Sequence, residues 1–411
     1  TIRCPAFGQE ESTPRSMPDI QDPADRGAAL AANRNVKMAR SAHAYVRGNT
    51  AKFYEWLSHV TVACPDGPPV WICGDCHIGN LGPVADAGGR VEIQIRDLDQ
   101  TVIGNPAHDL IRMGLSLASA ARGSDLPGVT TVHMLEQMVE GYESAFAGEE
   151  VDEADHPDTV RLVLQEALGR SWKHLARERI GDAKPTIPLG KRFWPLSGEE
   201  RDAVDALFEH DDVRRLVTGL RGRDAGDEVC VLDAAYWVKG CSSLGLLRHA
   251  VIARVGGKGG ELCLVDIKEA VAAVAPRAAK AAMPRDNAER VVEGARHLAP
   301  NLGDRMLAAR LLDRAVFMRE LRPQDLKLEV NALTHEEAMA VARFLAGVVG
   351  RAHARQMDPP TRRRWLAELR RNRSKTLDAP GWLWATIVQL MAAHEAAYLD
   401  HCRRYVLQQA A

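Results

Sequence analysis

The stretch from Val70 to Arg112 constrains the fold of this chain more than any other. It reads VWICGDCHIGNLGPVADAGGRVEIQIRDLDQTVIGNPAHDLIR. Two short apolar runs, 70–73 and 91–95, each end at a glycine or at charged residues, as strands do when they lead into functional loops. We predict a β-hairpin-like pair of these two strands, connected through PVADAGGR, with a site where the strands end.

The length and the charge balance narrow the class of protein. The chain has 411 residues, of which 46% are hydrophobic and 26% charged, and its formal net charge is -2. This length fits two cores better than one, and near-neutrality gives no global attraction for nucleic acid or an anionic membrane. The polar N-terminal residues lack the hydrophobic segment of a signal peptide, and no apolar run is long enough to span a membrane. We therefore expect a cytoplasmic protein with reduced cysteines.

Hydrophobic periodicity divides the chain into four parts. Residues 1–69 form an arm followed by two helices, between 26 and 57, that break at Arg47. Arg47 is a candidate site residue, with a surface ion pair as the alternative. Residues 70–225 continue as helices after the opening stretch, with three helical patterns between 159 and 220. Residues 226–330 are β-rich with one helix at about 287–298, and residues 331–411 are helical.

The opening stretch contains the groups that phosphoryl transfer requires. A carboxylate must orient or deprotonate the attacking hydroxyl, and an amide oxygen with a second carboxylate holds the Mg²⁺ that bridges the phosphates. This set is available in Asp75, Asn80, Asp97, Asp99 and Asp109. The alternative is that these residues only cap helices and turns, which explains one or two of the positions but not all five.

GDCHIGN followed by IRDLDQTVIGNPAHDL resembles the signature of the aminoglycoside phosphotransferase and choline kinase branch of the protein-kinase-like superfamily. The resemblance implies that Asp75 is the catalytic base, with His77 in the same catalytic loop, and that Asn80 and Asp97 hold Mg²⁺. Asp99 competes with Asp97 as the metal ligand, and Asp109 would brace the loop. The stretch departs from that signature at Cys73, where those kinases usually have histidine, and at Asn105, where they usually have aspartate.

The string CGDCH, from Cys73 to His77, also matches a haem-attachment motif. Haem would use both thiols and take His77 as its axial ligand. Such attachment follows export, and it leaves Asn80 and Asp97 without a role. Haem binding and dithiol redox chemistry are therefore remote alternatives.

A kinase also needs a loop over the phosphates and a lysine that contacts them. No room for these exists before Asp75, but both follow downstream. A glycine-rich turn between strands contains Gly240, Ser242, Ser243 and Gly245, and the next strand ends in Lys268. We expect Glu293 to pair with Lys268, with Glu289 as the alternative. The parts would then be arranged in a circularly permuted order.

With this order in view, the chain more closely resembles the bacterial family called domain of unknown function 2252. The resemblance rests on KMARSAHAYVRGN, GDCHIGNLG, RDLDQTVIGNPAHDLIR, GCSSLGLLRHAVI, VDIKEA, ERVVEGAR, FMRELRPQDLK and GRAHARQMD, in that order. It implies an α+β, bilobal, circularly permuted protein-kinase-like fold and identifies no substrate. Arg319 and His353 are further candidates for polar groups near the cleft.

We therefore expect an ATP- and Mg²⁺-dependent phosphotransferase that acts on a hydroxyl of a small molecule or a protein. The alternative is a nucleotide-binding pseudokinase with a regulatory or scaffolding role, which would lack turnover. In either case Asp75, Asn80 and Asp97 should meet Gly245 and Lys268 across a cleft.

Overall fold

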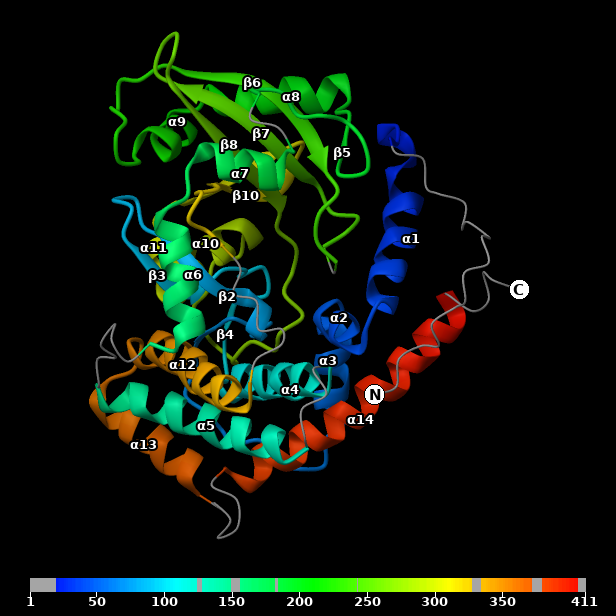
Figure 1. Ribbon diagram of the computed structural model, residues 1–411, viewed down its shortest axis with the longest axis vertical. Coiled ribbons are helices and arrows are strands. Elements are labelled where there is room, and N and C mark those ends of the chain that lie inside the picture. Colours follow the sequence, from blue (N-terminus) through cyan, green and yellow to red (C-terminus); the bar gives the residue numbers. More distant parts are fainter. Residues whose placement is uncertain are drawn as a thin grey trace.

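The structure is a computed structural model that describes residues 20–123, 128–148, 156–181, 184–241, 243–326, 334–371 and 379–405. A β-sheet with short helices forms the upper part in Figure 1, and long helices form the lower part. Two small two-stranded sheets lie between them. The chain is thus an α+β protein with antiparallel sheets, as we predicted.

The large sheet has six antiparallel strands in the order β5-β6-β7-β8-β10-β9. Their bounds are β5 (Phe193–Trp194), β6 (Val229–Trp237), β7 (Arg248–Val255), β8 (Glu261–Glu269), β9 (Met306–Leu311) and β10 (Arg314–Glu320). The predicted strands correspond to β6, β7, β8 and β10. The prediction missed β9, and it missed β5, which has only two residues within a loop rich in proline and glycine.

Residues alternate between the two faces of the sheet, as β-strands require. In β8, Val265 and Ile267 pack under α8 (Gly198–Phe208) and α9 (Asp211–Thr218), whereas Leu264 packs under α7 (Trp172–Arg179). Lys268 shares the face of Leu264, which is directed toward the lower part. We predicted that the β-rich part begins at residue 226. The three helices that pack on its sheet come before that residue, so this part of the structure begins earlier in the chain than predicted.

The lower part is built from long helices. They are α4 (Ala107–Gly123), α5 (Gly128–Ala147), α6 (Asp158–Leu168), α12 (His335–Ala354), α13 (Pro359–Arg370) and α14 (Gly381–Tyr405). Between residues 159 and 220 we predicted three helical patterns. The structure has four helices there, namely α6, α7, α8 and α9. The backbones of α5 and α12 approach so closely that a Cβ atom at Gly141 would collide with the carbonyl of Arg343. Glycine at this position therefore permits the contact.

Near the N-terminus, the region predicted as two helices contains three after the short 3₁₀ turn η1 (Pro23–Asp25). They are α1 (Arg26–Ala39), α2 (Ala42–Arg47) and α3 (Thr50–Leu57). The missed break lies at Ser41, whose side chain accepts a hydrogen bond from the N–H of Ala44 and so starts a new helix. Arg47 ends α2, at the break that the sequence predicted.

The predicted hairpin within the opening stretch has the wrong partner strand. β3 (Val91–Ile95) pairs with β2 (Leu81–Ala85), and β1 (Val70–Ile72) pairs with β4 (Val102–Gly104). We did not predict β2, because this strand contains glycine and proline, which are typical of turns. The segment between β1 and β2, which includes the 3₁₀ turn η2 (Ile78–Asn80), carries Asp75 and Asn80.

Two shorter helices, α10 (Asn287–Leu298) and α11 (Pro300–Gly303), follow β8 and lie between the large sheet and the long helices (Figure 1). Asp286 caps α10 by accepting hydrogen bonds from the N–H groups of Ala288 and Glu289. The predicted helix at 287–298 is confirmed with its bounds. Within the described ranges, no helix is both long and apolar enough to cross a membrane.

Candidate active site

The loop after β1 begins at Gly74, whose φ of 73° lies in the left-handed region. A Cβ atom there would also collide with the carbonyl oxygen of Gln100, so only glycine fits. Asp109, in the first turn of α4, holds this loop. Its Oδ2 accepts the N–H of Cys73 at 2.7 Å, and its Oδ1 accepts the N–H of Gly74 at 2.9 Å. Asp109 thus braces the loop from beneath, the role that the resemblance implied.

His353 lies behind this loop rather than near a cleft, where we placed it from the sequence. Its side chain is fully buried on α12, and its Nε2 lies 3.2 Å from Oδ2 of Asp109. Its Nδ1 lies 2.9 Å from the hydroxyl of Tyr142, which also accepts a hydrogen bond from Trp365 at 3.1 Å. His353 therefore links the loop to the helical core and positions Asp109.

Asp109→Ala is expected to lower the free energy of unfolding by about 2–4 kcal/mol, because it leaves two backbone N–H groups and the His353 ring buried without their acceptor. Urea unfolding measures this change. Asp202→Ala, at an exposed position on α8, is the control and should change stability by less than about 0.5 kcal/mol. Equal stability of the Asp109 variant and the unsubstituted protein would contradict the bracing role.

Asp75 is held by a residue that the sequence reasoning missed. Its Oδ1 accepts a hydrogen bond at 2.8 Å from Nε of Arg112, which is fully buried on α4. Arg112 also donates to the carbonyl of Val46 at 2.7 Å and stacks on the ring of Phe53. The sequence did contain a hint that Arg112 belongs to the site. It lies three residues after Asp109, so the two side chains share one face of α4. The pair fixes the carboxylate and leaves Oδ2 turned toward Nε2 of His77, 4.0 Å away.

Asn80 and His77 belong to the same short segment. Nδ2 of Asn80 donates to the carbonyl of Asp75 at 2.9 Å, which leaves the amide oxygen as the atom able to bind a cation. His77 is buried, and burial followed by the charges of Arg47 and Arg112 lowers its pKa well below the usual value. His77 is thus neutral at pH 7, which argues against a role as an acid there.

The structure brings Lys268 to Asp97 and Asp99, although 171 and 169 residues separate them in sequence. Nζ of Lys268 lies 3.2 Å from Oδ1 of Asp97 and 2.6 Å from Oδ2 of Asp99. The two acidic residues follow β3, while Lys268 lies near the end of β8 on the lower face of the large sheet. The Sγ of Cys73 lies 3.6 Å from the carbonyl of Asp97, so this pair of carboxylates lies beside the loop of Asp75.

Electrostatics distinguishes the two carboxylates. Partial desolvation by the surrounding protein opposes ionisation of Asp97, although its side chain is half-exposed. Favourable interactions, the charge of Lys268 first among them, outweigh this and lower the pKa of Asp97. Burial and the charge of Asp97 raise the pKa of Asp99 to about 6. The Lys268 pKa is raised overall: burial opposes its charge, and Asp97 and Asp99 outweigh that effect. At pH 7 the cluster is therefore ionised, with Asp99 as the group that takes up a proton first.

The predicted partner of Lys268, Glu293, is wrong. Glu293 lies on the solvent side of α10, where it pairs with His297 at 3.2 Å and Arg296 at 3.4 Å. The residue of α10 that reaches the site is Arg290, which donates to the carbonyls of Asp99 at 3.1 Å and Val271 at 2.9 Å. Positions three apart share one face of a helix, so helical periodicity alone does not separate the two residues. The structure does, because Arg290 is buried whereas the side chain of Glu293 is 40% exposed.

The lower face of the sheet also carries cations near Lys268. Arg248, opposite Lys268 on β7, forms a bidentate pair with Asp266. Arg319, opposite Asp266 on β10, donates to the carbonyl of Arg96 at 3.1 Å and so ties the sheet to the residue before Asp97. Lys239 lies over the ring of Trp237, and burial followed by the charges of Arg248 and Arg179 lowers its pKa well below the usual value.

The glycine-rich turn reaches toward the N-terminal helices. Gly240 and Gly245 have φ angles of 103° and 107°, which require glycine. The carbonyl of Gly240 accepts a hydrogen bond from Lys37 of α1 at 3.2 Å, and a Cβ atom at Gly48 would lie 2.8 Å from Sγ of Cys241. Of the predicted phosphate-binding residues in this turn, Ser242 lies outside the described residues. A Cβ atom at Gly240 would collide with Oγ of Ser243.

The cysteines of CGDCH are core residues. Cys73 and Cys76 are fully buried within the largest apolar cluster. A hydrogen bond between the two thiols and their burial raise the pKa of Cys73 well above its usual value. Reactive thiols need exposure and a lowered pKa, so these observations argue against haem attachment and dithiol chemistry.

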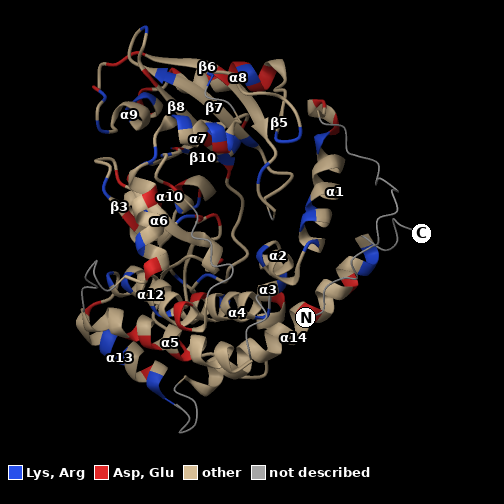
Figure 2. Cartoon of the chain, in the orientation of Figure 1, with Lys and Arg blue, Asp and Glu red and all other residues tan. Residues whose placement is uncertain are grey.

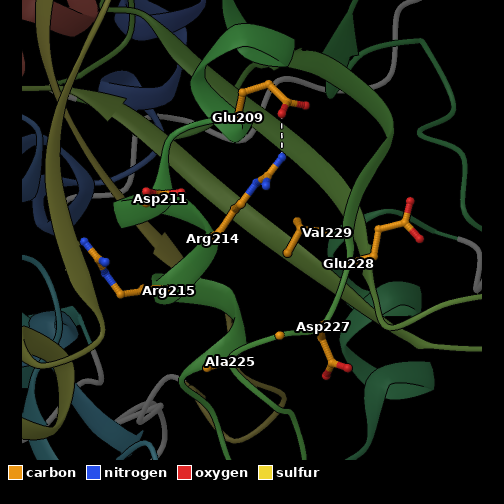
Figure 3. Close-up of a pocket in the computed structure, with 9 residues that line it drawn as sticks. Glu209, Asp211, Arg214, Arg215, Ala225, Asp227, Glu228 and Val229 are labelled. Carbon is orange, nitrogen blue, oxygen red and sulfur yellow. Dashed lines mark hydrogen bonds and ion pairs between the residues drawn. The ribbon is translucent and has the colours of Figure 1, made fainter.

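Two hollows in the described parts lie away from these residues. One, of about 590 Å³, lies between α8, α9 and the segment that leads into β6. Its charged groups are partly paired with each other, as Glu209 and Arg214 are in Figure 3. A second, of about 830 Å³, lies between residues 66–70 and α13. Neither is lined by a predicted site residue.

Comparison with known proteins gives one match. The model of a family described as an uncharacterized protein conserved in bacteria (DUF2252) matches residues 26–404. No curated protein and no solved structure matches the sequence. The family description contains no activity, so the chemistry of the site must be argued from its residues.

Proposed function

Because this chain belongs to the bacterial family DUF2252, whose description leaves its activity open, we propose from the site that it is an ATP-dependent phosphotransferase. The acceptor would be a hydroxyl group of a small molecule or a protein. We further propose that the fold is that of a protein kinase in circularly permuted order. The strand with the lysine precedes the catalytic loop in protein kinases, whereas Lys268 follows Asp75 here.

One observation carries the proposal. Lys268, from the sheet, meets Asp97 and Asp99, which follow the hairpin of β2 and β3. In protein kinases, a strand lysine and a metal-binding aspartate lie together at the nucleotide phosphates. Packing alone would not favour a buried lysine beside two carboxylates, because desolvating these charges costs free energy. A site that binds phosphates and a cation explains why they are retained.

The donor set fits Mg²⁺. This ion prefers oxygen ligands and keeps several waters, so one or two carboxylates suffice. Asp97 has a half-exposed side chain, Asp99 lies beside it, and Asn80 adds an amide oxygen. No group of three or more His, Cys, Asp or Glu side chains forms a metal site in the described ranges, which suits an ion that also binds phosphate. Bound there, Mg²⁺ would neutralise phosphate charge during transfer.

The cations on the lower face of the sheet would hold the rest of the polyphosphate. Lys239 has no ion pair with any residue that the structure describes, and the charges of Arg248 and Arg179, opposed in part by Asp266, act on it. A phosphate group would relieve this repulsion. Lys268 would then exchange part of its contact with the carboxylates for phosphate oxygens.

Asp75 would orient the acceptor hydroxyl through Oδ2, since Arg112 already occupies Oδ1. Its orientation is fixed by α4, through both Arg112 and Asp109. Transfer would then depend mainly on positioning and electrostatic stabilisation. The reaction would use the ATP of the cytoplasm, where we expect the protein.

The second candidate is a nucleotide-binding module without turnover. The observation that favours it is the Arg112 pair, because the guanidinium already occupies one oxygen of the Asp75 carboxylate. Turnover distinguishes the two functions. Slow ATP hydrolysis that depends on Asp75 would support the enzyme.

Isothermal titration with a non-hydrolysable ATP analogue tests the proposal. We expect binding that strengthens on addition of Mg²⁺, and we expect Asp97→Ala to remove this dependence. Glu293→Gln should bind like the unsubstituted protein, since Glu293 lies outside the site. The absence of Mg²⁺-dependent affinity for any nucleotide would refute the proposal.

The same titration should depend on pH. Mg²⁺ requires deprotonated carboxylates, and the pKa of Asp99 is raised to about 6. Affinity in the presence of Mg²⁺ should be constant above about pH 7 and fall as the pH drops below about 6, because protons then compete with the ion at Asp99. Asp99→Asn should flatten this profile, since the pKa of the remaining Asp97 is lowered. A profile that Asp99→Asn does not alter would exclude Asp99 as the titrating group.

A further inference from the structure

Arg47, at the end of α2, lies between the two loops of the proposed site. A Cβ atom added at Gly79 would lie 3.1 Å from Cζ of Arg47 and 3.3 Å from Cε1 of His77. The guanidinium and the imidazole therefore both flank the backbone next to Asn80. Gly48, which follows Arg47, lies against Cys241 of the glycine-rich turn. Arg47 thus lies where the Asp75 loop, α2 and the turn meet.

No acidic side chain pairs with Arg47 among the described residues. Its Nε is buried without a hydrogen-bond partner there, and the same holds for Nδ1 of His43, Nδ1 of His77 and Nη1 of Arg112. Arg47 and His77 both lie beside Gly79, and Arg112 donates to the carbonyl of Val46, the residue before Arg47. The charges of Arg47 and Arg112 act on both histidines. A guanidinium only donates, so the buried Nε of Arg47 and Nη1 of Arg112 are donors without an acceptor, and leaving them unpaired costs free energy. A ligand that accepts hydrogen bonds would satisfy them.

The N-terminal helices α1 and α2 beside the cluster carry only positive charge. From Arg26 to Tyr54 the chain contains no acidic residue, and α1 and α2 are marked only in blue in Figure 2. Burial followed by Arg47 and Arg112 lowers the pKa of His43 to about 4. The nearby carboxylates are Asp75, which Arg112 already neutralises, and Asp97, which pairs with Lys268. An anion is therefore the ligand that these groups favour.

We propose that Arg47, with His43 and His77, forms a binding site for a phosphate-class anion beside Asp75. Two sources share this chemistry, namely the terminal phosphoryl group of the nucleotide and an anionic group on the acceptor. Which of them binds depends on the proposed phosphotransferase function. The anion site itself does not, because it depends only on Arg47 and the buried polar atoms beside it.

Inorganic phosphate, titrated calorimetrically into the nucleotide-free protein, tests the site. We expect binding that Arg47→Gln weakens about tenfold to a hundredfold, the range for a lost charge-assisted hydrogen bond. Arg40→Gln, which removes the same charge from an exposed position, should leave it unchanged. Gly79→Ala keeps the charge but presses on the guanidinium, so it should also weaken binding. Thermal melting shows whether each variant is folded.

Two further titrations identify the source of the anion. Phosphate that binds with Mg²⁺·ADP but is displaced by Mg²⁺ and a non-hydrolysable ATP analogue marks the position of the terminal phosphoryl group. Phosphate that binds with both marks an anionic acceptor. If neither nucleotide binds while the Arg47-dependent phosphate site persists, the phosphotransferase function fails and the anion site stands. Phosphate binding that is absent, or unchanged in Arg47→Gln, would overturn the inference.

Discussion

Asp75→Asn is expected to reduce ATP turnover by about a hundredfold to ten-thousandfold, the range for losing a positioned general base. Asparagine keeps the shape of the side chain and an oxygen that can accept from Arg112. It loses the charge that orients or deprotonates an acceptor hydroxyl. The readout is release of labelled phosphate from ATP, or autophosphorylation, measured with purified protein.

Nucleotide binding should survive this substitution, because the groups proposed to hold Mg²⁺ and phosphate are Asn80, Asp97, Asp99 and Lys268. Isothermal titration with the ATP analogue should give an affinity within about threefold of that of the unsubstituted protein. Asp202→Asn, on the exposed side of α8, controls for the loss of one negative charge. Turnover that is equal in Asp75→Asn and in the unsubstituted protein would exclude Asp75 as the base and favour contamination or another site.

Lys268→Met should lower the free energy of unfolding by about 2–3 kcal/mol when divalent cations are chelated. The change leaves Asp99 and the half-exposed Asp97 next to each other without their cation, which costs less than a fully buried pair would. Methionine keeps most of the volume, so packing contributes little. Urea unfolding in EDTA measures the effect.

Mg²⁺ should restore part of this stability, because the two carboxylates of the variant attract a cation that replaces the ammonium. Binding of the ATP analogue should weaken at the same time. Glu293→Gln, the variant of the partner predicted from the sequence, should change stability by less than about 0.5 kcal/mol. If Lys268→Met were as stable as the unsubstituted protein in EDTA, the ion pairs would contribute nothing and the lysine would have to be explained by ligand binding alone.

Local signals predicted the elements that depend on neighbouring residues. The helix at 287–298 followed from its apolar period, and the breaks at Arg47 and Gly74 followed from turn residues. The prediction failed where the structure adopts a conformation that the local residue types do not favour. β2 contains glycine and proline, and Ser41 divides a continuous helical period through one hydrogen bond.

The site was predicted in its residue types and only in part in its contacts. The sequence proposed Asp75, Asn80, Asp97, Asp99 and Lys268 as candidates, and it predicted that Lys268 meets Asp97 across a cleft, where the structure has them 3.2 Å apart. The predicted partner of Lys268, Glu293, was wrong, because Glu293 and Arg290 share one face of α10 and no local pattern shows that Arg290 is the one that reaches the site. Arg112, buried behind Asp75, was missed because an arginine within a helix usually lies at the surface.

The sequence by itself determined the family, the α+β class and the acidic cluster of the opening stretch, since each depends on residues close together in the chain. Only the tertiary structure decided which cations meet those acids. Lys268 reaches Asp97 and Asp99 because alternation along β8 turns it toward the lower part, where packing of α10 against β1 and β9 brings the hairpin beneath the sheet. Contacts between residues so far apart in the chain depend on how the sheet and the helices pack together. This packing cannot be predicted from any one segment of the sequence.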